Sequence, residues 1–174
     1  VAALGTVAMT TGDDAAASMA VNGAQLFLSL QWNASTGGLT FEARVKVDDI
    51  TTVQIFVGLT DTLSLEAPFT MGAGDALTSN ATDAVGFLFD TAADTDKIWL
   101  VGVANNVDAT SQNSALAYVN GTYRKLRLTV TSGGVATFWI DDVKIGTTMA
   151  AAVTASVNLT PYIGGFSLAA ASRV

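Results

Sequence analysis

The sequence predicts an all-β domain, built as a sandwich or a barrel. Two segments, residues 39–47 and 125–131, alternate between apolar and polar side chains, which is the pattern of a strand with one buried face. Turn residues separate them from several other short apolar runs. No long stretch carries the 3.6-residue apolar stripe of a helix, so we expect antiparallel strands throughout.

Three further segments are nearly continuous apolar runs, residues 53–59, 84–89 and 98–104. Their short length and their Val, Ile, Phe and Trp content favour strands over buried helices. Because they lack polar alternation, we expect both of their faces to be covered. Weaker strand candidates are residues 25–30, 162–168 and 4–9.

A hairpin is predicted over residues 135–145, with Asp141 and Asp142 at its turn. Asp tolerates the backbone angles of a tight turn, although Asp-Gly is the stronger signal. Glycines mark other turns along the chain, at residues 37–38, 72–74, 120–121 and 132–134.

The remaining segments predict little regular structure. Alanine-rich residues 13–20 and 148–155 are compatible with a turn or two of helix. Residues 61–83 are expected to form the longest irregular piece, of the kind that often makes contacts on such folds. We expect one domain over residues 1–174, in which the first ~20 residues form an arm or an extra strand.

Composition excludes several kinds of chemistry. The 174 residues contain no cysteine and no histidine, which removes disulfides, thiolate or imidazole metal sites and Ser-His or Cys-His nucleophiles. The net charge of −7 makes a nucleic-acid partner unexpected. No apolar run approaches the ~20 residues that span a bilayer, and no signal peptide opens the chain, so we expect no membrane partner.

Carboxylates are the remaining candidates for acid–base or metal chemistry. A glycosidase needs two carboxyl groups facing each other across a cleft, and neither glutamate, Glu42 or Glu66, lies in a local arrangement that supplies such a pair. Asp90, Asp94 and Asp96 lie within seven residues and could wrap a calcium ion. The favoured interpretation of these three is a solvated acidic loop between two strands.

Aromatic residues suggest a different activity, because exposed rings stack on sugars. The candidates for carbohydrate binding are Trp32, Tyr118 and Tyr123, of which Trp32 lies in a turn-like stretch beside Asn33. Trp99 and Trp139 lie inside apolar strands, so core packing is expected for at least one of them.

The second half of the chain resembles a known family. Residues 121–123 (Gly-Thr-Tyr), the strand 126–130 and the hairpin 135–147 resemble the hairpin region of concanavalin A-like, laminin-G-like jelly rolls, except that Asp142 stands where that family usually has glycine. Residues 41–45 resemble the family's early core strand. The resemblance implies an antiparallel two-sheet β-sandwich, whereas the family's glucanase carboxylate motif is missing.

Residues 41–47, 57–62 and 83–90 look like virion proteins of tailed bacteriophages that carry this jelly roll. That resemblance implies a non-enzymatic capsid decoration or head-fibre protein at the virion surface. Its expected partners are the major capsid protein, sister subunits in a homo-oligomer such as a trimer, and a host glycan. It implies no cofactor other than the calcium already considered.

Two alternatives remain open at this point. One is a lectin-like carbohydrate-binding module on a cell or virion surface. The other is a divergent glycosidase, for which Asp90 and Asp94 would be the first residues to test.

Overall fold

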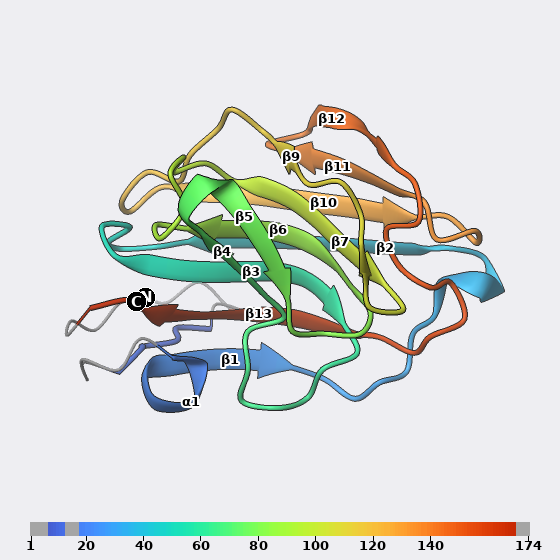
Figure 1. The fold of residues 1–174 in the computed structure, drawn as a ribbon, viewed down its shortest axis with the longest axis horizontal. Helices are drawn as coiled ribbons and strands as arrows, with labels where there is room; N and C mark the ends of the chain where they lie inside the picture. Colours follow the sequence, from blue (N-terminus) through green and yellow to red (C-terminus); the bar gives the residue numbers. More distant parts are fainter. Residues whose placement is uncertain (1–6, 13–17, 170–174) are drawn as a thin grey trace.

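The computed structural model describes residues 7–12 and 18–169, and it confirms an all-β chain with antiparallel strands (Figure 1). One short α-helix is present in these residues, α1 (Met19–Asn22), with two 3-10 turns, η1 (Ala34–Thr36) and η2 (Ala73–Asp75). The described residues include no helix long and apolar enough to cross a membrane. The strands are β1 (Gly23–Phe27), β2 (Leu39–Lys46), β3 (Val53–Thr60), β4 (Phe69–Gly72), β5 (Ala76–Ser79), β6 (Ala84–Asp90), β7 (Trp99–Ala104), β8 (Val107–Asp108), β9 (Gln112–Asn113), β10 (Tyr123–Val130), β11 (Ala136–Ile140), β12 (Val143–Met149) and β13 (Thr160–Ser167).

Two sheets form the sandwich (Figure 1). The larger sheet has seven strands in the order β1-β13-β3-β6-β7-β8, and β9 also pairs with β7. The smaller sheet has four strands in the order β12-β11-β10-β2. The strands β4 and β5 pair with each other and belong to neither sheet; this hairpin lies over the front of the larger sheet in Figure 1.

The main core lies between the two sheets. The alternation predicted for β2 and β10 is confirmed, since Leu126 and Leu128 of β10 are fully buried and pair with Ala43 and Phe41 of β2. Across the sandwich, Phe87 of β6 meets Phe138 of β11 edge to face at 5.5 Å. Each fully buried large side chain contributes roughly 1.5–3 kcal/mol to folding, so these strands hold the two sheets together.

A second core covers the opposite face of the larger sheet. Every residue of β3 and β6 is buried, as their unbroken apolar runs predicted. On this face Phe56 packs against Phe69 of β4 and Tyr162 of β13, with ring centroids 5.3 and 5.9 Å apart. An added Cβ on Gly86 would lie 2.8 Å from the Phe56 ring, so the absence of a side chain at Gly86 allows this ring to pack directly on the backbone of β6.

The hairpin that forms this cover corrects one expectation. Residues 61–83 are not irregular throughout, because β4 and β5 pair within them from Phe69 with Ser79 to Gly72 with Ala76. Four-residue strands are too short to show a period of two. The glycines at 72–74 belong to the tight connection, where Gly74 and Asp75 take positive φ angles of 74° and 53°.

Other sequence predictions have mixed outcomes. The turn at Asp141 and Asp142 is confirmed, and both residues take positive φ, 51° and 67°, as in a type I′ hairpin. Residues 148–155 end β12 and continue in turns, not in a helix. Residues 7–9 form no strand, and the rest of that candidate, like residues 13–17, lies outside the described residues.

Removal of the Phe69 ring tests the second core. We expect Phe69→Ala to lower the free energy of unfolding by about 3–5 kcal/mol, because the Phe69 ring is fully buried against Phe56 of the larger sheet. Chemical denaturation measures this change. Leu65→Ala, at a residue 64% exposed in the same connection, serves as the control and should change stability by less than ~0.5 kcal/mol. Equal effects of the two substitutions would contradict the burial of Phe69 against Phe56 in the second core.

The pKa of Asp90 makes the free energy of unfolding depend on pH. Burial raises the pKa of its carboxyl group above the ordinary value of 3.8, although the backbone N–H groups of Met71 and Ala92, each 2.9 Å away, act to lower it. At a pH between that ordinary value and the raised pKa, Asp90 has lost its proton in the unfolded chain but still holds it in the folded protein. The contribution of Asp90 to stability is therefore full at low pH and is lost as the pH rises through the raised pKa.

The measurement is the difference in unfolding free energy between the wild type and Asp90→Asn as a function of pH. We expect this difference to fall as the pH increases from about 4, since only the wild type titrates here. The exposed Asp94→Asn provides the matched control. A difference that increases with pH would mean that the pKa of Asp90 is lowered and not raised.

Candidate functional site

Trp32 lies on the loop between β1 and η1, which several hydrogen bonds hold in place. Its backbone N–H donates to the carbonyl of Leu159 at 3.2 Å, and the N–H of Leu159 donates back to Trp32 at 2.7 Å. Next to it, the Asn33 side-chain amide donates to Asn158 Oδ1 at 2.9 Å, and Ser35 Oγ donates to Asn33 Oδ1 at 2.8 Å. These contacts fix the loop while the Trp32 side chain stays 37% exposed.

The Trp32 hollow is the shallow depression in which this indole lies. Its volume is about 620 Å³, and it is lined by residues 27–32 and Leu63. Leu28 and Leu63 are exposed there, 54% and 43%, and Ser29 and Gln31 add polar groups beside the ring. An apolar surface bordered by a few polar groups suits a small polar ligand with an apolar face.

Tyr118, the second predicted sugar-binding residue, lies in the main core, and this expectation is corrected. Its side chain is 3% exposed and packs edge to face on Phe89, with ring centroids 5.4 Å apart. Burial raises the pKa of its phenol. A ring enclosed in this way cannot stack on a ligand from solvent.

Tyr123, the third predicted residue, is exposed but far from Trp32. It begins β10, where it pairs with Lys46 at the end of β2, and its side chain is 42% exposed. Trp32 precedes η1 and therefore lies near the other end of β2. Eight residues of strand at ~3.3 Å each separate these ends by roughly 25 Å, so the two rings cannot contact the same sugar.

The two other tryptophans take different positions. Trp99 is buried in the second core and donates from Nε1 to the carbonyl of Thr95 at 3.3 Å, which confirms the expected core packing of at least one of them. Trp139 lies on the outer face of the smaller sheet, where the Arg127 guanidinium lies 4.5 Å from its ring centroid.

The hypothesised calcium site at Asp90, Asp94 and Asp96 does not form. Among the described residues no group of three or more carboxylates could hold a metal ion together. Asp90 instead is buried and accepts backbone hydrogen bonds from Met71 and Ala92, so its oxygens are engaged in holding β4 and the following turn. Asp94 and Asp96 are exposed, as the solvated-loop interpretation predicted, but that interpretation is wrong for the buried Asp90.

Asp83 is a second buried carboxylate, which the sequence pattern did not single out as structural. Its Oδ1 accepts from the N–H of Thr154 at 2.6 Å, and its Oδ2 accepts from the N–H of Asn105 at 3.3 Å. Asp83 precedes β6 and Asp90 ends it, which separates them by roughly 23 Å. The two buried carboxylates therefore fasten loops and are too far apart to face a single glycosidic bond.

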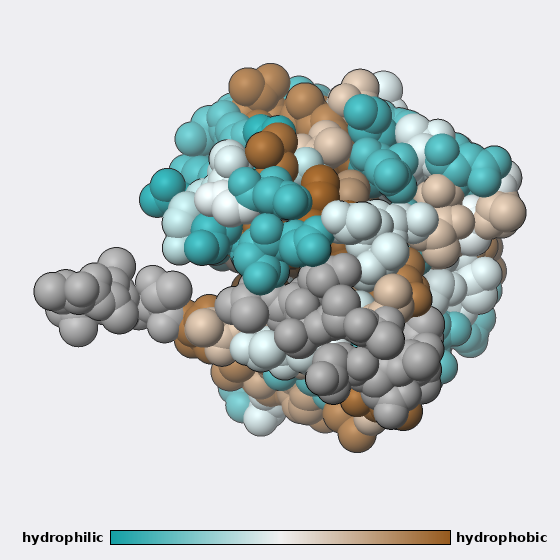
Figure 2. Space-filling view, turned by 90° about the vertical axis from the view of Figure 1, so that its left-hand side faces the viewer, coloured by the Kyte–Doolittle hydropathy of each residue, from teal (hydrophilic) through white to brown (hydrophobic). Residues whose placement is uncertain are grey.

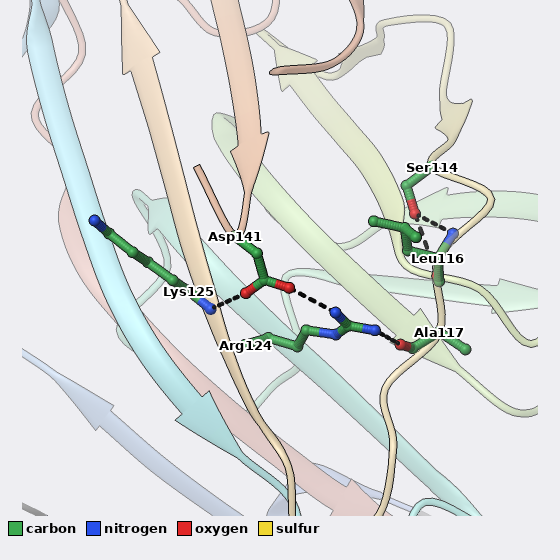
Figure 3. A network of polar contacts seen from close by, with 6 residues as sticks. All are labelled: Ser114, Leu116, Ala117, Arg124, Lys125 and Asp141. Carbon is green, nitrogen blue, oxygen red and sulfur yellow. Dashed lines mark hydrogen bonds and ion pairs between the residues drawn. The ribbon is translucent and has the colours of Figure 1, made fainter. Parts of the chain in front are cut away.

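Asp141 organises the edge of the smaller sheet (Figure 3). Its Oδ2 pairs with Arg124 Nη1 at 2.5 Å, and its Oδ1 accepts the backbone N–H of Lys125 at 2.9 Å. Arg124 Nη2 in turn donates to the carbonyl of Ala117 at 3.0 Å. Burial acts to raise the pKa of Asp141, but the Lys125 N–H and the Arg124 guanidinium outweigh it and lower the pKa. The carboxylate thus ties the β11–β12 turn to the segment that contains Tyr118.

Comparison with solved structures finds this fold at low sequence identity. The carbohydrate recognition domain of Emp46p, a point mutant, gives a TM-score of 0.52 at 11% identity, covering 87% of this chain and 73% of that chain. An endo-β-1,4-glucuronan lyase from the fungus Trichoderma reesei gives 0.52 at 10% identity, covering 93% and 68%. The globular domain of T. cruzi calreticulin gives 0.54 at 10% identity, covering 87% and 66%.

No protein-family model matches the sequence, and no curated protein does. Nothing in these comparisons bears on the resemblance to phage virion proteins, which stays a prediction. Likeness at such low identity is evidence of the fold alone. The chain thus shares the fold of these structures, an antiparallel two-sheet β-sandwich of the jelly-roll type that the sequence predicted.

Proposed function

We propose that this protein is a non-enzymatic carbohydrate-binding β-sandwich whose Trp32 hollow receives a sugar ring. The observation that carries the proposal is the exposed indole of Trp32, fixed by its backbone pairing with Leu159. A carbohydrate recognition domain shares the fold, which supports the proposal without assigning a ligand.

The chemistry of the hollow fits this ligand class. The C–H face of a pyranose packs against an indole as an apolar surface, while its hydroxyl groups need polar partners at the rim. Gln31 and Ser29 supply such partners beside the ring. Because the loop is already held by the Asn33–Asn158 hydrogen bond, binding does not require it to be ordered first.

The non-enzymatic part of the proposal is supported by the placement of the carboxylates. Asp83 and Asp90 are engaged by backbone N–H groups at opposite ends of β6. Of the described residues, those that line the Trp32 hollow include no acidic side chain. A sugar bound there meets no carboxyl pair in the geometry that glycoside hydrolysis requires.

A virion role is compatible with sugar binding and rests on the sequence resemblance. In that setting the protein would decorate a phage capsid or a head fibre, with the major capsid protein or sister subunits as its partners. A glycan bound at Trp32 would then belong to the host cell surface.

Substitution of Trp32 tests the proposed function. A glycan array identifies a ligand for the wild type, and calorimetry then compares it with Trp32→Ala. We expect the substitution to weaken binding at least tenfold, or about 1.4 kcal/mol, because buried tryptophans dominate small interfaces. Val143→Ala, at an exposed apolar residue on the other sheet, should leave the affinity unchanged. An array that stays blank with and without calcium, or unchanged binding by Trp32→Ala, would refute the proposal.

A further inference from the structure

The positive charges of this acidic protein are concentrated on one surface. Of its eight Lys and Arg residues, five project from the outer side of the smaller sheet; among the described residues Glu42 is the carboxylate on that side of the strands, and Asp142 adjoins it at the β11–β12 turn. The other residues then hold fourteen acidic and three basic side chains, a net charge of −11. We call this surface the basic face, and it comprises Glu42, Arg44, Lys46, Tyr123, Lys125, Arg127, Trp139 and Lys144.

Strand register places these side chains next to one another. Arg127 of β10 lies opposite Glu42 of β2 on one side and opposite Trp139 of β11 on the other. Trp139 in turn lies opposite Lys144 of β12, and Lys125 lies opposite Arg44. Figure 2, which looks at the end where β2 stops and β10 begins, shows hydrophilic residues gathered in its upper left part, at the level of this sheet.

Most of these cations have no anionic partner. Lys125 pairs with Glu42 at 3.4 Å and with Asp142 at 2.9 Å. In the part of the chain that the structure describes, no ion pair or hydrogen bond from the side chain engages the other four cations of the face, Arg44, Lys46, Arg127 and Lys144. Their charge is therefore available to an external ligand.

Two aromatic rings hold the guanidinium groups in place. Arg44 lies 4.7 Å from the centroid of Tyr123, and Arg127 lies 4.5 Å from that of Trp139. Stacking of this kind restricts the arginine side chains and leaves their N–H groups able to bind carboxylates in pairs. The rings also give the face apolar surface between its charges.

Hydroxyl groups continue the face toward its other end. Thr129 of β10 lies opposite Thr40 of β2 and Thr137 of β11, so three threonines form a row across the sheet. Beside this row is a shallow hollow of about 410 Å³, lined by residues 37–40 and 129–132. A ligand that lies along the strands therefore contacts cations at one end of the face and hydroxyl groups at the other end.

We propose that the basic face binds an acidic polysaccharide, a chain of sugars that carry carboxylate groups. Such a polymer has the three features that the face matches, namely repeated negative charges, apolar ring faces and hydroxyl groups. The backbones of Arg44 and Lys125 lie about 5 Å apart across the strands, and successive cations along β2 and along β10 lie about 7 Å apart, so consecutive sugar units can each reach one. This site is separate from the Trp32 hollow and does not depend on the function proposed for it.

The charge of the rest of the molecule argues against nucleic acid as the occupant. A duplex carries about one phosphate per 1.7 Å of its axis, a denser line of charge than one carboxylate per sugar unit, so the net charge of −11 on the other residues repels a duplex more strongly than the polysaccharide. A second copy of this chain is the other competitor, since its acidic surfaces also complement the face. The experiment below separates all three occupants.

The test measures binding of polygalacturonate and of its fully methyl-esterified form by calorimetry. We expect the wild type to bind only the charged polymer, and to bind it more weakly when salt increases from about 0.05 M to about 0.5 M. The triple variant Arg44→Gln/Lys46→Gln/Lys144→Gln should bind it at least tenfold more weakly, or about 1.4 kcal/mol. Lys97→Gln removes a cation outside the face and should change the affinity less than about twofold.

Each contrary outcome overturns the inference in a different way. Equal binding of both polymer forms would show that charge is not recognised, and unchanged binding by the triple variant would place the site elsewhere. Duplex DNA that binds as tightly as polygalacturonate would indicate a general anion surface. Dimers in sedimentation that the triple variant abolishes, without polymer binding, would identify a second copy as the occupant. Trp32→Ala should leave polygalacturonate binding intact, so failure here is distinguishable from failure of the Trp32 proposal.

Discussion

Burial of β3 and β6 on both faces is the constraint on which the rest of the structure depends. The larger sheet lies between the smaller sheet and the β4–β5 hairpin, and Phe56 seals the hairpin side against Phe69 and Tyr162. The centre of the larger sheet therefore has no free face for a ligand. Accessible surface is left at the outer face of the smaller sheet, at the sheet edges and in the loops, and both sites proposed above lie there.

The buried carboxylates serve this packing. Asp83 and Asp90 lie at the two ends of β6. Asp83 accepts the distant backbone N–H groups of Asn105 and Thr154, whereas Asp90 accepts one from Met71 in β4 and one from Ala92 in the turn that follows it. Asp141 does the same at the edge of the smaller sheet through Arg124 and Lys125. In a chain without cysteine, these carboxylates hold loops in place through hydrogen bonds.

The sequence was most informative where burial is periodic. The alternation in residues 39–47 and 125–131 and the apolar runs of β3 and β6 predicted strands that the structure contains. The four-residue strands of the hairpin were missed because they carry no readable period. The sequence also predicted the exposure of Trp32, since it stands in a turn-like segment with polar neighbours.

The site residues were harder to predict because their positions depend on long-range contacts. Tyr118 is buried since its segment is held against the sheet by Arg124 and Asp141, which no local pattern reveals. The basic face arises from three separate segments whose register brings Arg44, Arg127 and Lys144 onto one surface. Alternation predicted outward-facing cations on two of these strands, but not that they would be neighbours.

The central claim is that ligands bind only at the surfaces which this three-layer packing leaves open. Nuclear magnetic resonance of the wild type, titrated with a bound glycan, tests it most directly through side-chain signals of Trp32, Arg44, Arg127 and Phe69. The account predicts shifts at the Trp32 indole or at the two guanidinium groups, with Phe69 unchanged. Shifts centred on Phe69 and the β4–β5 hairpin would show that the cover opens to admit the ligand, and would contradict the account.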